Sequence, residues 1–215
     1  MHGIVRFADG KRERRLTDDE YKALGAALRK AVEVNVWPAA VAAIRFLALS
    51  GWRSGEVLGL RWGPELDLAR RTARLGDTKT GASMRPLSHG ACDVLRGLTR
   101  SGELVFAATR GTGRMLGFSN LWARIAKLGE LPVDVTPHTL RHSFASLAND
   151  LGYSEPTIAA LIGHKGRSIT SRYIHTADPL LLAAADAVAD RTAELMGELE
   201  VTANVVTLRQ PTAHR

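Results

Sequence analysis

Thr136-Pro-His-Thr-Leu-Arg-His-Ser-Phe-Ala145 is the stretch that best indicates the fold of this 215-residue chain, together with Leu161-Ile-Gly-His-Lys-Gly-Arg-Ser-Ile-Thr-Ser-Arg-Tyr-Ile-His175. The first stretch begins with a threonine that can cap a helix and with Pro137 at the first helical position. His138 and Arg141 are then one helical turn apart and share a face. A helix start also offers free backbone N–H groups to a phosphate.

Six residues stand in a fixed order along the chain: Arg53, Lys79, His138, Arg141, His164 and Tyr173. Guanidinium groups bind the non-bridging oxygens of a phosphate, a tyrosine can attack phosphorus, and lysine and histidine can carry protons. The set therefore suits cleavage of a phosphodiester without a metal ion or another cofactor.

The order and spacing of these residues resemble the tyrosine recombinase (phage integrase) family over roughly residues 15–185. His138 lies three residues before Arg141, and His164 lies nine before Tyr173. The resemblance implies a site-specific DNA recombinase that cleaves and rejoins DNA strands through a 3′-phosphotyrosyl intermediate. It also implies double-stranded DNA as partner, self-association as a tetramer on paired sites, and accessory DNA-bending proteins.

The same resemblance assigns roles to the amino-terminal candidates. Arg53 becomes the first catalytic arginine, and Glu56 fills the family's acidic position three residues on. Lys79, in a Thr-Lys-Thr-Gly turn, would protonate the departing 5′ oxygen from a mobile hairpin. Taken alone, Arg53 could be a surface residue paired with Glu56, and Lys79 a solvated side chain at a hairpin tip.

The carboxy-terminal candidates receive roles in the same way. Tyr173 becomes the nucleophile, His138 accepts its proton, and His164 joins the two arginines in holding the phosphate. His175 is a supporting residue. Taken alone, a tyrosine on an amphipathic helix is usually part of the core, and His164 could simply end a helix.

A zinc site is an alternative for this helix, because His138 and His142 have the i, i+4 spacing of metal ligands. A metalloprotease helix would carry a glutamate directly after the first histidine, and this chain has Thr139 there. We therefore expect no metal, and His142 is predicted to point away from His138 as a packing residue.

Composition agrees with a polyanionic partner. The net charge is +7 and the isoelectric point is about 10.1, which fits binding to nucleic acid. A basic soluble protein without such a partner is the alternative. Cys92 is the only cysteine, so no internal disulfide can form, and it is predicted to be a buried hydrophobic residue. No membrane span or export signal is recognised, so we expect a cytoplasmic protein, bacterial or phage and nucleoid-associated, without a membrane partner.

The periodicity predicts a mixed α/β (α+β) fold, a mainly helical tyrosine-recombinase catalytic domain with a small three-stranded antiparallel sheet. The strands are expected at 65–68, 72–75 and 83–87, and Pro86 places the third at an edge. Thr17 is predicted to cap the first helix and Ser54 the third. Helices are predicted at residues 17–34, 38–50, 54–60, 89–98, 117–129, 137–151, 155–162, 167–175 and 178–198.

The domain prediction is a basic linker at 1–15, the catalytic domain at 16–199 and a flexible tail at 200–215. The helical core-binding domain that usually precedes the catalytic domain in this family is expected to be absent. The last helix carries an apolar stripe with two interpretations. It either packs on its own domain or docks on a neighbouring protomer.

Three alternative functions remain. A type IB topoisomerase uses a similar set of residues, but it usually has a lysine where this chain has His138, and its core is larger. A non-catalytic DNA-binding relic would be expected to have lost one of the six residues. A helix-turn-helix repressor could be imitated by residues 137–162, although Arg53 and Lys79 argue against it.

Overall fold

The structure is a computed structural model, and it describes residues 14–63, 65–76, 83–108, 110–111, 113–164 and 178–198. The described part of the chain is mainly helical with one small antiparallel sheet, which confirms the predicted fold class. The elements of the described residues, in chain order, are α1 (Asp18–Glu33), α2 (Pro38–Ser50), α3 (Ser54–Leu58), β1 (Leu66–Asp67), β2 (Thr72–Leu75), β3 (Ser83–Pro86), α4 (His89–Arg96), α5 (Phe118–Leu128), α6 (Pro137–Asp150), α7 (Glu155–Ile162) and α8 (Pro179–Leu195).

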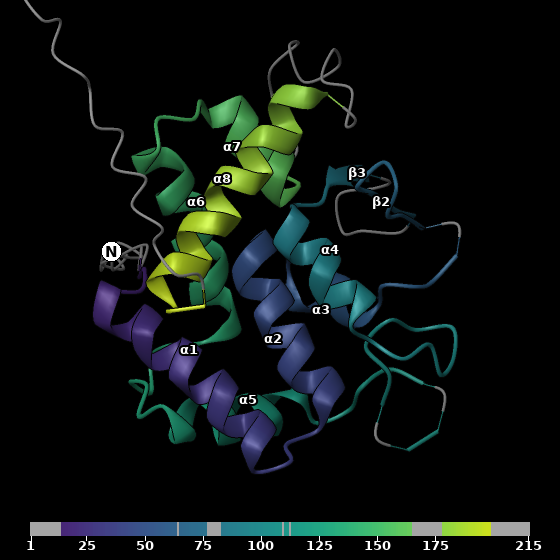
Figure 1. Cartoon of the computed structure of the whole chain (residues 1–215), viewed down its shortest axis with the longest axis vertical. Coiled ribbons are helices and arrows are strands. Elements are labelled where there is room, and N and C mark those ends of the chain that lie inside the picture. Colours follow the sequence, from purple (N-terminus) through teal and green to yellow (C-terminus); the bar gives the residue numbers. More distant parts are fainter. Residues whose placement is uncertain are drawn as a thin grey trace, which may run out of the picture.

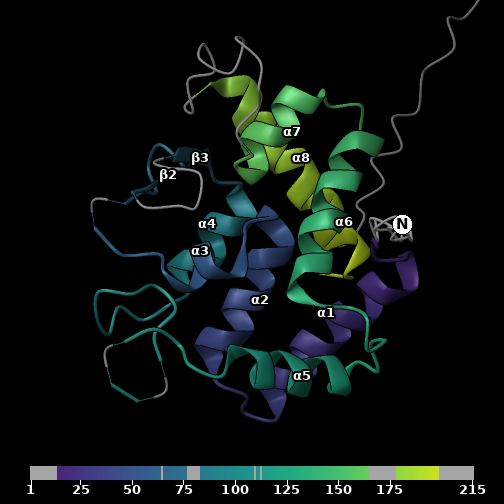
Figure 2. The ribbon, with the colours of Figure 1, turned by 180° about the vertical axis from the view of Figure 1, so that it is seen from behind.

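Helix α2 is the centre of the molecule (Figure 1). Pro38 occupies its first turn, where a missing N–H costs nothing. Ten of its 13 residues are buried, so other elements must cover it on nearly every side. Helices α1, α4, α5, α6 and α8 all pack against it, and Figure 2 shows α5 crossing one end of this bundle.

Helix α1 begins as the sequence predicts. The Thr17 hydroxyl accepts the Glu20 N–H at 3.3 Å, and the Glu20 carboxylate accepts the Thr17 N–H at 2.8 Å, a reciprocal capping box. Arg14 pairs with Glu20, and Arg15 pairs with Asp150 at 2.6 Å. These two arginines belong to the segment predicted as a linker, and both are tied to the helical domain.

The three strands form an antiparallel sheet in the order β1-β2-β3. Thr72 pairs with Pro86, and Leu75 pairs with Ser83. Strand β3 is therefore an edge, as Pro86 predicts, because proline cannot donate to a further strand. The segment between the paired residues Leu75 and Ser83 contains Lys79, which lies outside the described residues, as does the predicted helix at 167–175.

Helix α8 packs on its own chain, between α2 and the α6–α7 pair (Figure 1). Its buried residues include Leu181, Ala184 and Val188, whereas Leu180 is 76% exposed. Just beyond the helix, Glu198 pairs with Arg45 of α2 at 2.8 Å. Of the two interpretations of the apolar stripe, the structure supports packing within the chain.

Two further features bear on the sequence predictions. Cys92 is fully buried in α4, as predicted, and burial raises the pKa of its thiol to about 11, which makes it a poor nucleophile. Within the part of the chain that is described, no helix is both long and apolar enough to cross a membrane.

Candidate nucleic-acid cleavage site

The turn between α2 and α3 presents Arg53. Gly51 ends α2 with a left-handed φ of 64°, and a Cβ there would lie 2.7 Å from the Phe144 ring of α6. Glycine therefore lets α6 approach the turn closely. Helix α3 starts at Ser54 with Arg53 at its cap position, so the prediction that Ser54 caps a helix reaching residue 60 is wrong.

Glu56 replaces the missing side-chain cap. Its carboxylate accepts the Arg53 backbone N–H and the Arg53 Nη1, both at 3.0 Å. It also accepts both ends of the Arg85 guanidinium fork, each at 2.9 Å. Burial opposes ionisation of Glu56, but the hydrogen bonds and charge of Arg85, with the hydrogen bonds of Arg53, outweigh burial and lower the pKa of Glu56 to about 2. Glu56 is therefore ionised at neutral pH and fixes Arg53.

Arg85 is a site residue that the sequence predictions missed. It lies in β3, its side chain is fully buried, and it is 5.1 Å from the centroid of the Trp52 ring. The only signal in the sequence was an arginine inside a short strand, directly before Pro86. A strand with one exposed face offers no reason to expect a buried arginine.

Helix α6 places Arg141 beside this cluster. The Thr136 hydroxyl accepts the Thr139 N–H at 3.3 Å, and Pro137 is the first helical residue, as predicted. Arg141 is 4% exposed, and its Nη1 donates to the carbonyls of Gly51 at 2.8 Å and Ile162 at 2.7 Å. It thus ties α6 to the ends of α2 and α7.

The other Arg141 terminal nitrogen, Nη2, is buried and has no hydrogen-bond partner among the described residues. Burial lowers the pKa of Arg141 to about 10, and the nearby charge of Arg53 acts in the same direction. The group remains charged at neutral pH. A buried donor without a hydrogen bond costs folding free energy unless an anion or a water molecule accepts from it.

His138 lies on the same face of α6, and His142 packs against it. Their ring centroids are 4.5 Å apart and their planes are perpendicular. The prediction that His142 points away is wrong, because side chains four residues apart on a helix are neighbours. Burial, then the charge of His142, lowers the pKa of His138. No cluster of metal-ligand type is present among the described residues.

His164 follows the end of α7. Gly163 adopts a left-handed φ of 69°, and the His164 backbone N–H closes the helix on the Ala159 carbonyl at 2.8 Å. Burial lowers the pKa of His164, and the charges of Arg141, Arg53 and Arg85 lower it further. His164 therefore lies within the electrostatic reach of the arginine cluster.

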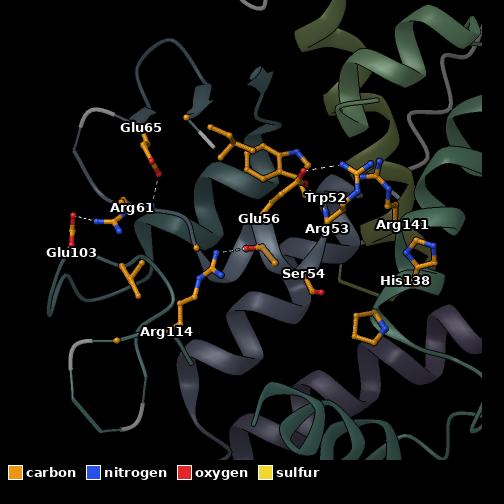
Figure 3. Close-up of a pocket in the computed structure, with 17 residues that line it drawn as sticks. Trp52, Arg53, Ser54, Glu56, Arg61, Glu65, Glu103, Arg114, His138 and Arg141 are labelled. Carbon is orange, nitrogen blue, oxygen red and sulfur yellow. Dashed lines mark hydrogen bonds and ion pairs between the residues drawn. The ribbon is translucent and has the colours of Figure 1, made fainter. Parts of the chain in front are cut away.

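Of these residues, Arg53, Glu56, His138 and Arg141 border a cleft of about 840 Å³. Figure 3 shows Arg53, Arg141 and His138 along one wall and Arg114 on the other. Arg114 donates to the Gly55 carbonyl at 2.9 Å. A cleft lined by several arginines and by one histidine with a lowered pKa is suited to an anion. Lys79, Tyr173 and His175 lie outside the described residues, so their approach to this cleft stays a prediction.

The sequence matches the model of the phage integrase family over residues 14–179. A shufflon-specific DNA recombinase of Escherichia coli is 36% identical over 168 residues, which cover 76% of this chain and 40% of that protein. Tyrosine recombinase XerD of Lacticaseibacillus casei is 34% identical over 146 residues, covering 62% of this chain and 49% of that protein. The chain thus spans half or less of the length of these curated relatives.

Solved structures share the fold. The XerA recombinase matches 84% of this chain and 64% of its own, with a TM-score of 0.56 and 21% identity. A lambda integrase fragment, crystallised as a dimer bound to a COC′ core site, matches 75% of this chain and 62% of its own. Its TM-score is 0.57 and its identity 24%.

Proposed function

Because the chain belongs to the phage integrase family, we propose that it carries the catalytic centre of a site-specific tyrosine recombinase acting on double-stranded DNA. The observation that carries the proposal is the buried Arg141, whose Nη2 has no partner among the described residues, beside Arg53 in one cleft. Two guanidinium groups at one site can hold the non-bridging oxygens of a scissile phosphate.

The proposed reaction is a transesterification. The Tyr173 oxygen attacks phosphorus, the bond to the 5′ oxygen breaks, and a 3′-phosphotyrosyl bond forms. Arg53 and Arg141, assisted by His164, stabilise the additional negative charge of the pentavalent transition state. Rejoining is the reverse reaction with the 5′ hydroxyl of a partner strand, so the phosphodiester energy is conserved.

Two proton transfers accompany the attack. A tyrosine has an ordinary pKa of about 10, so it must lose its proton as it attacks, and His138 is the proposed acceptor. The lowered pKa of His138 keeps it neutral and able to accept. Lys79 is the proposed donor to the departing 5′ oxygen, and His175 a supporting residue near the nucleophile.

Recombination would require several copies of the chain on paired DNA sites. We propose tetrameric assembly there, assisted by DNA-bending proteins. The protein, bacterial or phage in origin, would act in the cytoplasm in association with the nucleoid. The topoisomerase alternative is not favoured, since the matched relatives are recombinases. Relaxation of a supercoiled plasmid, assayed beside recombination of two sites, would distinguish these activities.

A nicked suicide duplex, which traps the covalent intermediate, tests the proposal. The wild-type chain should form a protein–DNA adduct on denaturing gels, and Tyr173→Phe should form none while still binding DNA. Tyr153→Phe is the matched control and should form the adduct normally. Tyr153 is partly buried and lies just before α7 in the sequence. An adduct that persists in Tyr173→Phe would refute the assignment of the nucleophile.

A further inference from the structure

The buried arginine of β3 has no role in the reaction described above. Arg85 contributes a fully buried guanidinium, and both of its terminal nitrogens donate to Glu56 at 2.9 Å. Its Nε is also buried and has no hydrogen-bond partner in the described residues. Replacing such a pair by apolar groups often costs a protein little stability, so stability alone does not explain why an arginine is placed here.

Glu56 is fully occupied. Its two oxygens receive two bonds from Arg85 and two from Arg53, and a carboxylate has about four acceptor positions. The single negative charge of Glu56 is therefore shared between two arginines. Without Arg85, the carboxylate of Glu56 would pair with Arg53 alone and would neutralise more of its positive charge.

The charge balance around Glu56 follows from this sharing. Three arginines (Arg53, Arg85 and Arg141) and the carboxylate of Glu56 leave a net charge of two positive units. Without Arg85, one positive unit would remain. A phosphodiester carries one negative charge and gains a second in the pentavalent transition state, so the loss of one cation matters most at that point.

Arg85 also sets the position of neighbouring backbone. Its guanidinium lies against the Trp52 ring in the α2–α3 turn. A Cβ added at Gly163 would overlap the guanidinium carbon of Arg85. The arginine therefore contacts both the turn that presents Arg53 and the end of α7, from which His164 follows.

We propose that Arg85 is a positioning residue that takes up the Glu56 carboxylate, so that Arg53 keeps its charge available for a phosphate group. The proposal rests on the proposed function for the identity of that phosphate. It requires no contact between Arg85 and DNA.

Binding of inorganic phosphate, followed by NMR titration of backbone amides, tests the electrostatic part without any strand cleavage. Arg85→Met should weaken phosphate binding about tenfold or more relative to wild type. Arg96→Met is the matched control, because Arg96 is also paired with a carboxylate, Asp93, but both groups are exposed. It should bind phosphate like wild type.

A second substitution separates positioning from simple bracing. Adding Glu56→Gln to Arg85→Met removes the negative charge that would otherwise neutralise Arg53. If Arg85 acts through Glu56, the double variant should regain at least about threefold in phosphate affinity over Arg85→Met. If Arg85 only braces the fold, the double variant should be no better than the single one.

Thermal melting verifies that each variant folds. If Arg85→Met does not melt cooperatively, Arg85→Gln, which keeps a hydrogen bond to Glu56 without the charge, takes its place with the same expectations. The suicide duplex is then run on the same proteins, and Arg85→Met should form adduct about 30-fold more slowly than Arg96→Met.

The outcomes are distinguishable. Phosphate binding that depends on Arg85 as stated, with no adduct from the wild-type chain, would support the role of Arg85 and reject strand cleavage as the function. Adduct formation by the wild-type chain, with equal phosphate affinity in Arg85→Met and Arg96→Met, would overturn the role of Arg85. Absence of recovery in the double variant would overturn it as well.

Discussion

Arg141 combines two tasks in a single side chain. One terminal nitrogen joins the ends of α2 and α7, and the other has no partner among the described residues at the edge of the cleft. The planar fork of arginine can do both at once, whereas the point charge of lysine cannot. The residue is therefore as much part of the framework as of the proposed chemistry.

Arg141→Lys should reduce covalent capture of DNA by about 100-fold, since a charge remains but the second donor is lost. Its melting temperature should also fall, because the bonds to the Gly51 and Ile162 carbonyls are weakened. Arg124→Lys, on an exposed position of α5, is the control and should change neither quantity. Full activity of Arg141→Lys would contradict the proposed phosphate contact.

The pH dependence of cleavage should report His138. The pKa of His138 in the folded chain lies below the ordinary 6.5. The single-turnover rate should therefore stay level as the pH falls to this lowered pKa, and should decline at more acid pH, where the base becomes protonated. Conformational stability should fall in the same direction, because the unfolded chain binds more protons between the two pKa values.

His142→Asn refines this measurement. It removes a positive neighbour that opposes protonation of His138, so the acid decline of the rate should shift to higher pH. Single-turnover rates across the acid range would show the shift, and NMR titration of the His138 ring would confirm its origin. A decline that stays in place, or moves to lower pH, would exclude His138 as the base.

At the scale of elements, the end of α7 is confined by strand β3. Gly163 has a left-handed φ, and the space beside it is filled by Arg85. Gly152 also has a positive φ, 84°, but apart from its two chain neighbours no residue has an atom within 4 Å of the position of its missing Cβ. An alanine at Gly152 would therefore meet backbone strain alone, whereas an alanine at Gly163 would meet backbone strain and steric overlap.

Gly152→Ala should cost about 1 kcal/mol of unfolding free energy, from backbone strain alone. Gly163→Ala should cost about 2 kcal/mol more, because the buried guanidinium must also shift. Urea unfolding measures both costs. Gly163→Ala should additionally slow adduct formation, whereas Gly152→Ala should not; equal costs at the two positions would show that Arg85 does not confine α7.

For the whole molecule, the packing of α8 decides what can be removed. The helix packs against α2 and against the α6–α7 pair, and its buried residues are Leu181, Ala184, Ala185, Val188, Ala189 and Thr192. Full burial of a side chain such as leucine or valine contributes about 1.5–3 kcal/mol. The free energy lost on removing the whole helix is thus comparable with the total unfolding free energy of an ordinary domain.

Deleting residues 178–215 should abolish cooperative melting, whereas deleting 199–215 should preserve it, because Glu198 and the whole of α8 remain. Circular dichroism melts of the two truncations provide the measurement. A folded, phosphate-binding product of the longer deletion would instead favour docking of this helix on a neighbouring protomer, the other interpretation of its apolar stripe.

Features that depend on residues close together along the chain could be predicted from the sequence. The capping box at Thr17, the helix start at Pro137 and the period-two strands at 72–75 and 83–86 are specified by neighbouring residues. The spacing of His138 and Arg141 places them on one face for the same reason. The order of all six candidates along the chain was sufficient to indicate the family.

Contacts between groups far apart in the sequence were visible only in the folded structure. Nothing local to β3 predicts that Arg85 is buried against Glu56, or that Arg141 binds the carbonyls of Gly51 and Ile162. Nor could the apolar stripe of α8 reveal which surface covers it. Such contacts depend on how distant elements pack, because a buried charge is tolerated only where its partner is brought to it.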